Sequence, residues 1–409
     1  MVKNSIQKVG MMYGASILAI VLGFLISIFN SRVLGPDRFG DLKFIETVAR
    51  FIASLVSVGF FISLARLLAI NKEKTKERRY IGLLVIIFVI ASLIGIVLIL
   101  SFSLAEPYFF GHELDATLRA FFFIVPVILG TTALLEILKG MHKIYSLSLL
   151  SILPALSYLL IIYLIDQNQT IYLETVLLVL YGVNLLIVLF FFISLKPDFN
   201  IKKYLVQELF KENKFNGRPI YFGSLAGVAT THIAGLSISY FMNNTQVGFF
   251  MLALTICSPL LVIPSVMGTV FFKQFATIRS IPNKVFYFSI LSTLAALVVF
   301  YGLIEKVVVT FYTEEYLPVA DISRYLIIGF IFHGLGDLIN RFLGAKGQGR
   351  LLRNAAYMVG IVNVLGYTIL IKFFNINGAI ITKILASGLY LVVMYIYYLN
   401  FVKSNRTKP

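Results

Sequence analysis

A series of long apolar runs repeats along the whole chain and constrains its fold more than any other feature. A helix of about 20 apolar residues crosses the hydrocarbon core of a bilayer. With 59% hydrophobic and 13% charged residues, the composition is that of a membrane protein rather than a soluble domain. The sequence therefore predicts an all-α polytopic membrane protein with about twelve transmembrane helices. The twelve runs lie at residues 9–30, 42–68, 80–105, 116–138, 144–165, 172–195, 220–242, 247–276, 285–309, 322–343, 355–374 and 378–402.

Basic residues are concentrated in alternate loops of this assignment. If the N-terminus lies in the cytoplasm, the loops and adjoining span ends on that side hold 25 of the 35 Lys and Arg residues, and those on the opposite side hold 7. The other three, Arg50, Arg66 and Lys383, are counted with the spans themselves. Because cytoplasmic loops carry the excess of basic residues, we expect a multi-pass protein of the cell inner (cytoplasmic) membrane with both termini cytoplasmic. These loops also account for the net charge of +16, so no nucleic-acid partner is expected.

Two short matches indicate that the chain consists of two similar halves. Residues 39–42 align with residues 247–250, and residues 140–143 align with residues 344–347. Both matches fall at equivalent places in the two sets of six spans. Six spans in each half give both halves the same orientation, as in transporters built from parallel repeats.

The chain is accordingly divided into three parts. We expect an N-terminal six-helix lobe at 1–195 and a C-terminal six-helix lobe at 219–409, with a central cavity. The segment 196–218 between them is expected to be a cytoplasmic amphipathic linker that lies on the membrane; an ordinary solvated linker is the alternative. The apolar face of this linker consists of Ile201, Leu205, Val206, Leu209 and Phe210.

Charged and polar side chains share one face of the second span. Lys43, Glu46 and Arg50 are spaced i, i+3, i+7, and Ser54 and Ser57 continue their face. Arg50 lies about 13 Å along this helix, near the middle of the bilayer. An arginine there is costly unless it faces water or a partner. The face is therefore a candidate site for an anionic group. The alternative is a structural ion pair of Glu46 with Arg50, whose order along the helix favours pairing.

A second polar face occurs in the tenth span. His333, Asp337 and Arg341 are spaced i, i+4, i+8, and Asp337 is expected to pair with Arg341. A histidine near mid-membrane can exchange a proton near neutral pH, which makes these residues candidates for ion coupling. The alternative is a neutral, hydrogen-bonded His333. Lys383, near the start of the twelfth span, is expected to extend outward to the membrane surface.

Other kinds of site are not indicated. The single cysteine, Cys257, excludes an intrachain disulfide, and the four histidines form no H-E-x-x-H pair, so neither a metal nor a cofactor is expected. No G-x-x-x-x-G-K-[ST] motif is present, so the energy for any transport would come from an ion gradient or the membrane potential. The first apolar run is too long for a signal peptide and ends in Asn-Ser-Arg, so no cleavable leader is expected.

A short motif joins the first two spans. Residues 31–41, S-R-V-L-G-P-D-R-F-G-D, form a tight elbow at Gly35-Pro36 with Arg32 and Arg38 beside it. This motif resembles the first-helix elbow of the polysaccharide flippases, which belong to the multidrug/oligosaccharidyl-lipid/polysaccharide exporter superfamily. Arg32 matches the arginine position of the family motif. Contact with phospholipid headgroups is the alternative role for these two arginines.

The resemblance implies a function in cell-surface polysaccharide biosynthesis. It implies transport of an undecaprenyl-diphosphate-linked oligosaccharide by alternating access, coupled to H+ or Na+. It also implies partners among the membrane lipids and the other polysaccharide-assembly membrane proteins. The candidate substrate-binding residues are then Arg32, Lys43, Glu46, Arg50, Ser54 and Ser57.

Three other functions remain open from the sequence. A multidrug exporter of the same superfamily would favour carboxylates over Arg50 in its binding site. A peptidoglycan-precursor flippase would share the chemistry, although the twelve spans argue against members with more. A membrane-embedded glycan polymerase or glycosyltransferase would need a large external loop, whereas every external loop here is of ordinary length. A transporter rather than an enzyme is therefore expected.

Overall fold

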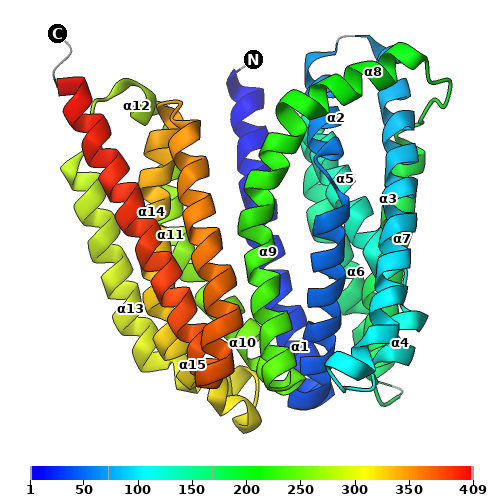
Figure 1. The fold of residues 1–409 in the computed structure, drawn as a ribbon, viewed down its shortest axis with the longest axis vertical. Coiled ribbons are helices and arrows are strands. Elements are labelled where there is room, and N and C mark those ends of the chain that lie inside the picture. The colour runs from blue at the N-terminus through cyan, green and yellow to red at the C-terminus, as the bar shows by residue number, and fades with distance from the viewer. Residues whose placement is uncertain (1, 72, 168, 407–409) are drawn as a thin grey trace. The chain divides into compact units, whose positions relative to one another are not determined.

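The computed structural model describes residues 2–71, 73–167 and 169–406, which fold into helices with no strand among them (Figure 1). Lys72 and Lys408, two of the basic residues counted above, lie outside the described residues. The elements run in chain order as α1 (Val2–Val56), α2 (Phe60–Ile70), α3 (Lys74–Phe109), α4 (Asp115–Ala120), α5 (Ile124–Gly140), α6 (Ile144–Asp166), α7 (Leu173–Ser194), α8 (Lys203–Glu212), the π-helical turn η1 (Asn213–Gly217), α9 (Arg218–Phe241), α10 (Asn244–Cys257), α11 (Pro259–Val270), α12 (Phe272–Thr277), α13 (Asn283–Phe311), the 3-10 turn η2 (Glu314–Tyr316), α14 (Leu317–Ala345) and α15 (Gly349–Arg406).

Each of the twelve predicted spans coincides with helix in the described residues, which confirms the all-α polytopic fold. Within the part of the chain that the structure describes, eight helices are long and apolar enough to cross a membrane. Two of these, α1 and α15, each contain two predicted spans joined across a kink. The predicted span at 116–138 corresponds to α4 followed by α5, and the predicted span at 220–242 corresponds to α9.

Single residues with positive φ divide the two longest helices. In α1 the residue is Gly35, with φ 68°, and Pro36 follows it. Glycine adopts positive φ without a clash, and proline has no amide hydrogen for the helix ladder, so the elbow expected at this dipeptide is present. In α15 the residue is Asn375, with φ 52°, and asparagine tolerates positive φ better than most residues.

The chain forms two compact units, of which the first is Met1–Leu225. Within it, α5 packs against α1, α2, α3 and α7, and α1 also packs against α6. The second predicted span is not continuous, because α1 ends at Val56 and α2 begins at Phe60. Val58 (φ 41°) and Gly59 (φ 79°) turn the chain between them.

The amphipathic segment before α9 packs onto α2 in this first unit. Leu205 and Leu209 of α8 are fully buried, so this part of the apolar face contacts protein, whereas Phe210 of the same face is exposed. Arg66 pairs with Glu212 at 2.8 Å, and Lys76 pairs with Glu208 at 3.0 Å. Burial raises the pKa of Glu208, but hydrogen bonds from Tyr80 and Lys76 and the Lys76 charge outweigh it, so this pKa lies below its usual value. The three-part division of the chain at 195 and 218 stays a prediction.

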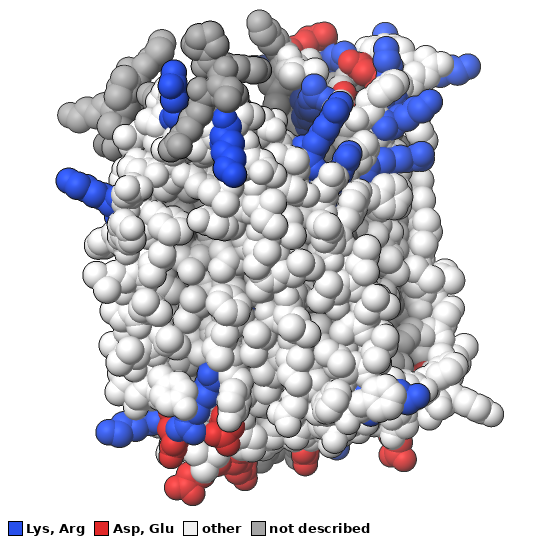
Figure 2. All heavy atoms as spheres, turned by 60° about the vertical axis from the view of Figure 1, so that its left-hand side comes forward, with Lys and Arg blue, Asp and Glu red and all other residues white. Residues whose placement is uncertain are grey.

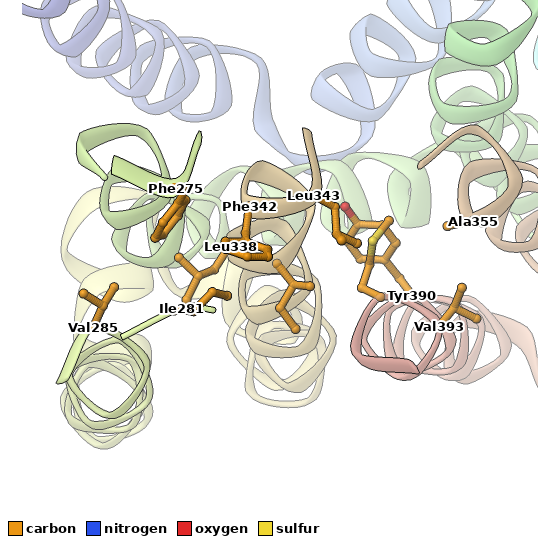
Figure 3. Packing of buried hydrophobic residues seen from close by; sticks show 11 residues of the cluster. Phe275, Ile281, Val285, Leu338, Phe342, Leu343, Ala355, Tyr390 and Val393 are labelled. Carbon is orange, nitrogen blue, oxygen red and sulfur yellow. The ribbon is translucent and has the colours of Figure 1, made fainter. Parts of the chain in front are cut away.

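The second unit, Ala226–Pro409, is built around α14. This helix packs against α10, α11, α12, α13 and α15. Phe275 and Phe342 meet edge to face with ring centroids 5.4 Å apart, within a buried cluster (Figure 3). The buried members of this cluster are Phe275, Ile281, Val285, Leu338, Ile339, Phe342, Leu343, Ala355, Tyr390, Val393 and Met394.

Charged side chains on the surface lie at the ends of the helices. On the face shown in Figure 2, Lys and Arg predominate at one end, Asp and Glu lie with some basic side chains at the other, and the band between them is almost uncharged. Apolar side chains such as Val97, Leu186, Leu291 and Val298 are widely exposed. A multi-pass membrane protein accounts for this, because lipid covers such a band.

Candidate functional site

The elbow of α1 carries charge on its outer surface. Arg32 and Arg38 are exposed, and Arg38 pairs with Asp41 at 3.3 Å. Ser31 is buried and donates a hydrogen bond to the carbonyl of Ile28. The elbow therefore presents its arginines to the surroundings of the protein and not to its own core.

Beyond the elbow, the polar face of α1 begins with an ion pair. Lys43 Nζ lies 3.0 Å from Glu46 Oε2 and 5.2 Å from the centroid of the Phe39 ring. Tyr181 of α7 donates its hydroxyl hydrogen to Glu46 Oε1 at 3.4 Å. The pairing of Glu46 with Arg50, which the sequence offered as an alternative, is wrong. Lys43, one turn before Glu46, forms the ion pair with its carboxylate in place of Arg50.

Arg50 consequently has no carboxylate of its own. In the part of the chain that the structure describes, its guanidinium makes no hydrogen bond and no ion pair, and Glu46 and Tyr181 act on its charge only at longer range. Its side chain is exposed, while Ala49 and Ile52 beside it are buried. A guanidinium with all its donors available is suited to a planar anion such as a phosphate.

The polar face ends at the break between α1 and α2. The hydroxyls of Ser54 and Ser57 donate to carbonyls of their own helix, those of Phe51 and Ser54. The carbonyl of Leu55, near the end of α1, accepts a hydrogen bond from the hydroxyl of Tyr221 at 2.9 Å. Tyr221 is at the start of α9, so the helix that carries Arg50 is fixed to α9 at this break.

Three polar residues of this region were not found from the sequence. Tyr158 of α6 is fully buried and donates to the side-chain carbonyl of Asn30 in α1. Tyr181 contacts Glu46, as described above. All three lie in or beside apolar runs, which is a weak signal in a chain with 22 tyrosines. They add hydrogen-bonding groups near the Lys43–Glu46 pair.

The Lys43–Glu46 pair predicts a specific pattern of stability. Lys43→Gln or Glu46→Gln alone should destabilise the protein by about 1–3 kcal/mol, because each leaves a largely buried charge without its partner. The double variant should recover most of this loss. Thermal unfolding of the detergent-solubilised variants measures the effect. Losses that simply add in the double variant would show that the two side chains are not coupled.

In the second unit, the predicted pair on α14 is present. Arg341 Nε donates to Asp337 Oδ2 at 3.1 Å, and Arg341 Nη2 donates to Ser265 Oγ of α11 at 2.8 Å. One turn earlier, the His333 ring stacks on Tyr390 of α15, with centroids 4.7 Å apart. This unit therefore has its own polar line between α14 and its neighbours.

The structure corrects the prediction for Lys383. Its side chain does not extend outward along the membrane but runs across α14. The Lys383 Cγ atom is 3.2 Å from the position that a Cβ atom would occupy at Gly329. Its ammonium lies 5.1 Å from the centroid of the buried Phe330 ring.

Metal binding has no visible basis in the residues that are described. Among them, no group of three or more His, Cys, Asp or Glu side chains could hold a metal ion. Cys257 is buried, and its Sγ lies 3.6 Å from the carbonyl oxygen of Ser323.

Charged groups inside apolar spanning helices mark candidate functional positions of a membrane protein. The chain belongs to the polysaccharide biosynthesis protein family, whose model matches residues 5–278. The resemblance noted at residues 31–41 is thereby confirmed. No curated protein matches the chain significantly.

Solved structures share the fold at low sequence identity. The lipid II flippase MurJ in an inward closed conformation has a TM-score of 0.78 at 16% identity, with 96% of this chain and 89% of that chain covered. An inward-facing multidrug resistance MATE family transporter of the MOP superfamily has a TM-score of 0.69 at 12% identity, with 96% of each chain covered. An outward-facing one has a TM-score of 0.54 at 15% identity, with coverage of 98% and 96%. The chain therefore has the two-half fold of these flippases and exporters.

Proposed function

We propose that this protein translocates an undecaprenyl-diphosphate-linked oligosaccharide across the cytoplasmic membrane for cell-surface polysaccharide biosynthesis. The observation that carries the proposal is the guanidinium of Arg50, inside a spanning helix and without a carboxylate of its own. Membership of the polysaccharide biosynthesis family and the fold shared with a lipid II flippase support it. The lipid tail can stay in the bilayer while the charged head group passes along the protein.

The charge of the candidate site favours an anion over a cationic drug. Lys43 neutralises Glu46, so Arg50 leaves the polar face of α1 with a net positive charge. A diphosphate supplies oxygens that match the planar fork of arginine. We assign Arg50 as the anchor of the diphosphate. Arg32, Lys43, Glu46, Ser54 and Ser57 are proposed as the surrounding substrate-binding residues.

Ion-driven alternating access is the proposed mechanism. The Arg50 site would be exposed in turn to each side of the membrane, and solved structures of the same fold include an inward-facing and an outward-facing conformation. His333, Asp337 and Arg341 on α14 are the proposed coupling residues, with H+ or Na+ as the ion. Membrane lipids and other polysaccharide-assembly proteins are the proposed partners.

We also propose that both termini are cytoplasmic, and cysteine labelling tests this. In a Cys257→Ala background, cysteine at position 74 or 350 should react with an impermeant thiol reagent only from the cytoplasmic side. Cysteine at position 113 or 314 should react only from outside. All four native side chains are exposed in the structure. Labelling of position 350 from outside would overturn the proposed orientation.

Deletion in the source organism tests the proposed function. Without the protein, complete lipid-linked repeat units should accumulate on the cytoplasmic face of the membrane. Lipid extraction with mass spectrometry, combined with a membrane-impermeant glycosidase, measures both their structure and their side. Accumulation of units that have already been translocated would contradict flipping and would point to a polymerase.

A further inference from the structure

Lys383 is a partly buried basic side chain at the contact of α15 with α14 in the second unit. It follows the kink of α15 at Asn375 and lies against α14 at Gly329, with its ammonium over the Phe330 ring. A cation over an aromatic face gains some electrostatic attraction, but less than water or a carboxylate supplies. The surroundings of Lys383 are thus unusual for a charged side chain.

The described carboxylates of the second unit do not pair with Lys383. The sequence from residue 226 onward holds five acidic residues, and four of them lie at the acidic ends of α13, η2 and α14. The fifth, Asp337, is already paired with Arg341. Within the described residues, Lys383 forms no ion pair and no hydrogen bond. The groups within electrostatic range are Cys257 on α10 and His333 on α14, and Asp337 acts on His333 in turn.

We propose that Lys383 is a proton-carrying site, whose side chain binds a proton as the ammonium ion and releases it as the neutral amine during each transport cycle. The step needs no other reactant, because the proton passes to water or to a neighbouring polar group. The physical reason is that apolar surroundings without a counter-ion disfavour the charged form of an amine. The proposal rests on the proposed ion-driven function and selects the proton as its ion.

Polar groups continue from Lys383 along the contact of α14 with α15. His333 stacks on Tyr390, and the Tyr390 hydroxyl accepts a hydrogen bond from Asn340 Nδ2 at 2.7 Å. Asp337 and Arg341 complete this line toward the end of α14. His333 and Asp337 are the members of this line that can take up and release a proton, and His333 lies within electrostatic range of Lys383.

Sodium fits these surroundings poorly. A sodium ion needs several oxygen ligands and is repelled by an ammonium ion. Among the described residues, Asp337 is the one acidic residue of this unit that lies away from the helix ends. Its carboxylate is already in an ion pair with the Arg341 guanidinium. The Lys383 ammonium already supplies a positive charge here, so a sodium ion is not needed to provide one.

Proteoliposomes that contain a pH-sensitive dye test this proposal. The substrate is an undecaprenyl-diphosphate-linked oligosaccharide, and the variants are Lys383→Met, which removes the charge, and Lys383→Arg, which keeps it permanently. Both should lose the proton flux that accompanies translocation and should respond to a pH gradient at least about 10-fold less than the unmodified protein. Lys372→Met is the matched control, because Lys372 is an exposed lysine of the same helix, and it should behave as the unmodified protein.

Failure of the proton site can be distinguished from failure of the proposed function. If the unmodified protein translocates the glycan lipid but moves no protons, or if Lys383→Arg keeps the full proton flux, the proton site is wrong and the flippase function stands. If the unmodified protein translocates nothing, the proposed function itself is wrong. Circular dichroism and thermal unfolding of Lys383→Arg establish that the variant is folded.

Discussion

Arg50→Ala should abolish translocation of the lipid-linked glycan while the protein remains folded in the membrane. Arg50 forms no hydrogen bond and no ion pair with a described residue, so its removal breaks no such bond between helices. If its guanidinium holds the diphosphate, the change removes charge-assisted hydrogen bonds worth about 2–5 kcal/mol. This corresponds to a loss of about 30- to 4000-fold in transport rate. Translocation assays on equal amounts of reconstituted protein measure it.

Two further arginine variants complete the test of the anchor. Arg50→Lys should retain part of the activity, because it keeps the charge but not the planar fork. Arg38→Ala is the control, since Arg38 is 65% exposed at the elbow and pairs only with Asp41 among the described residues. It should transport at nearly the unmodified rate. Equal activity of Arg50→Ala and Arg38→Ala would remove Arg50 from the mechanism.

Gly59→Ala should cause the largest loss of stability of any single small substitution near the site. Gly59 has φ 79°, and a Cβ atom there would lie 2.5 Å from the carbonyl oxygen of Gly217. Left-handed backbone costs an alanine about 1–2 kcal/mol, and the overlap forces the backbone at η1 to move. We expect a total loss above about 3 kcal/mol. Thermal unfolding and the amount of protein in the membrane measure it.

Gly23→Ala, in α1, is the matched control for this prediction. Gly23 is exposed, and a Cβ atom there would have no neighbouring heavy atom within 4 Å. The change should be neutral or should stabilise the helix by up to about 1 kcal/mol, because alanine has the higher helix propensity. Equal melting temperatures for the two variants would show that the break between α1 and α2 tolerates a side chain.

Span positions and the elbow could be predicted from the sequence because each depends on local chemistry. Apolar length fixes a membrane-spanning helix, and Gly35-Pro36 cannot continue one without a bend. The break at Val58 and Gly59 could not be predicted in this way. It lies inside an apolar run, and its geometry depends on the close approach of Gly217 from a distant part of the chain.

Charge pairing was harder to predict than helix positions. The i, i+3 and i, i+4 spacings around Glu46 allow either Lys43 or Arg50 as its partner, and only the side-chain geometry selects Lys43. Lys383 was placed incorrectly because its distance from the end of a span suggested an exit to the membrane surface. The packing of α15 on α14 at Gly329 directs it inward instead.

Reconstituted translocation of the glycan lipid tests the central claim most directly. Vesicles would carry a radiolabelled undecaprenyl-diphosphate-linked oligosaccharide in both leaflets, and a membrane-impermeant glycosidase would be added outside. With the unmodified protein, digestion should proceed well beyond the share of the outer leaflet; with Arg50→Ala it should stop there, as in protein-free vesicles. Digestion that stops at the outer leaflet with the unmodified protein, or that proceeds equally with Arg50→Ala, would contradict an Arg50-anchored flippase.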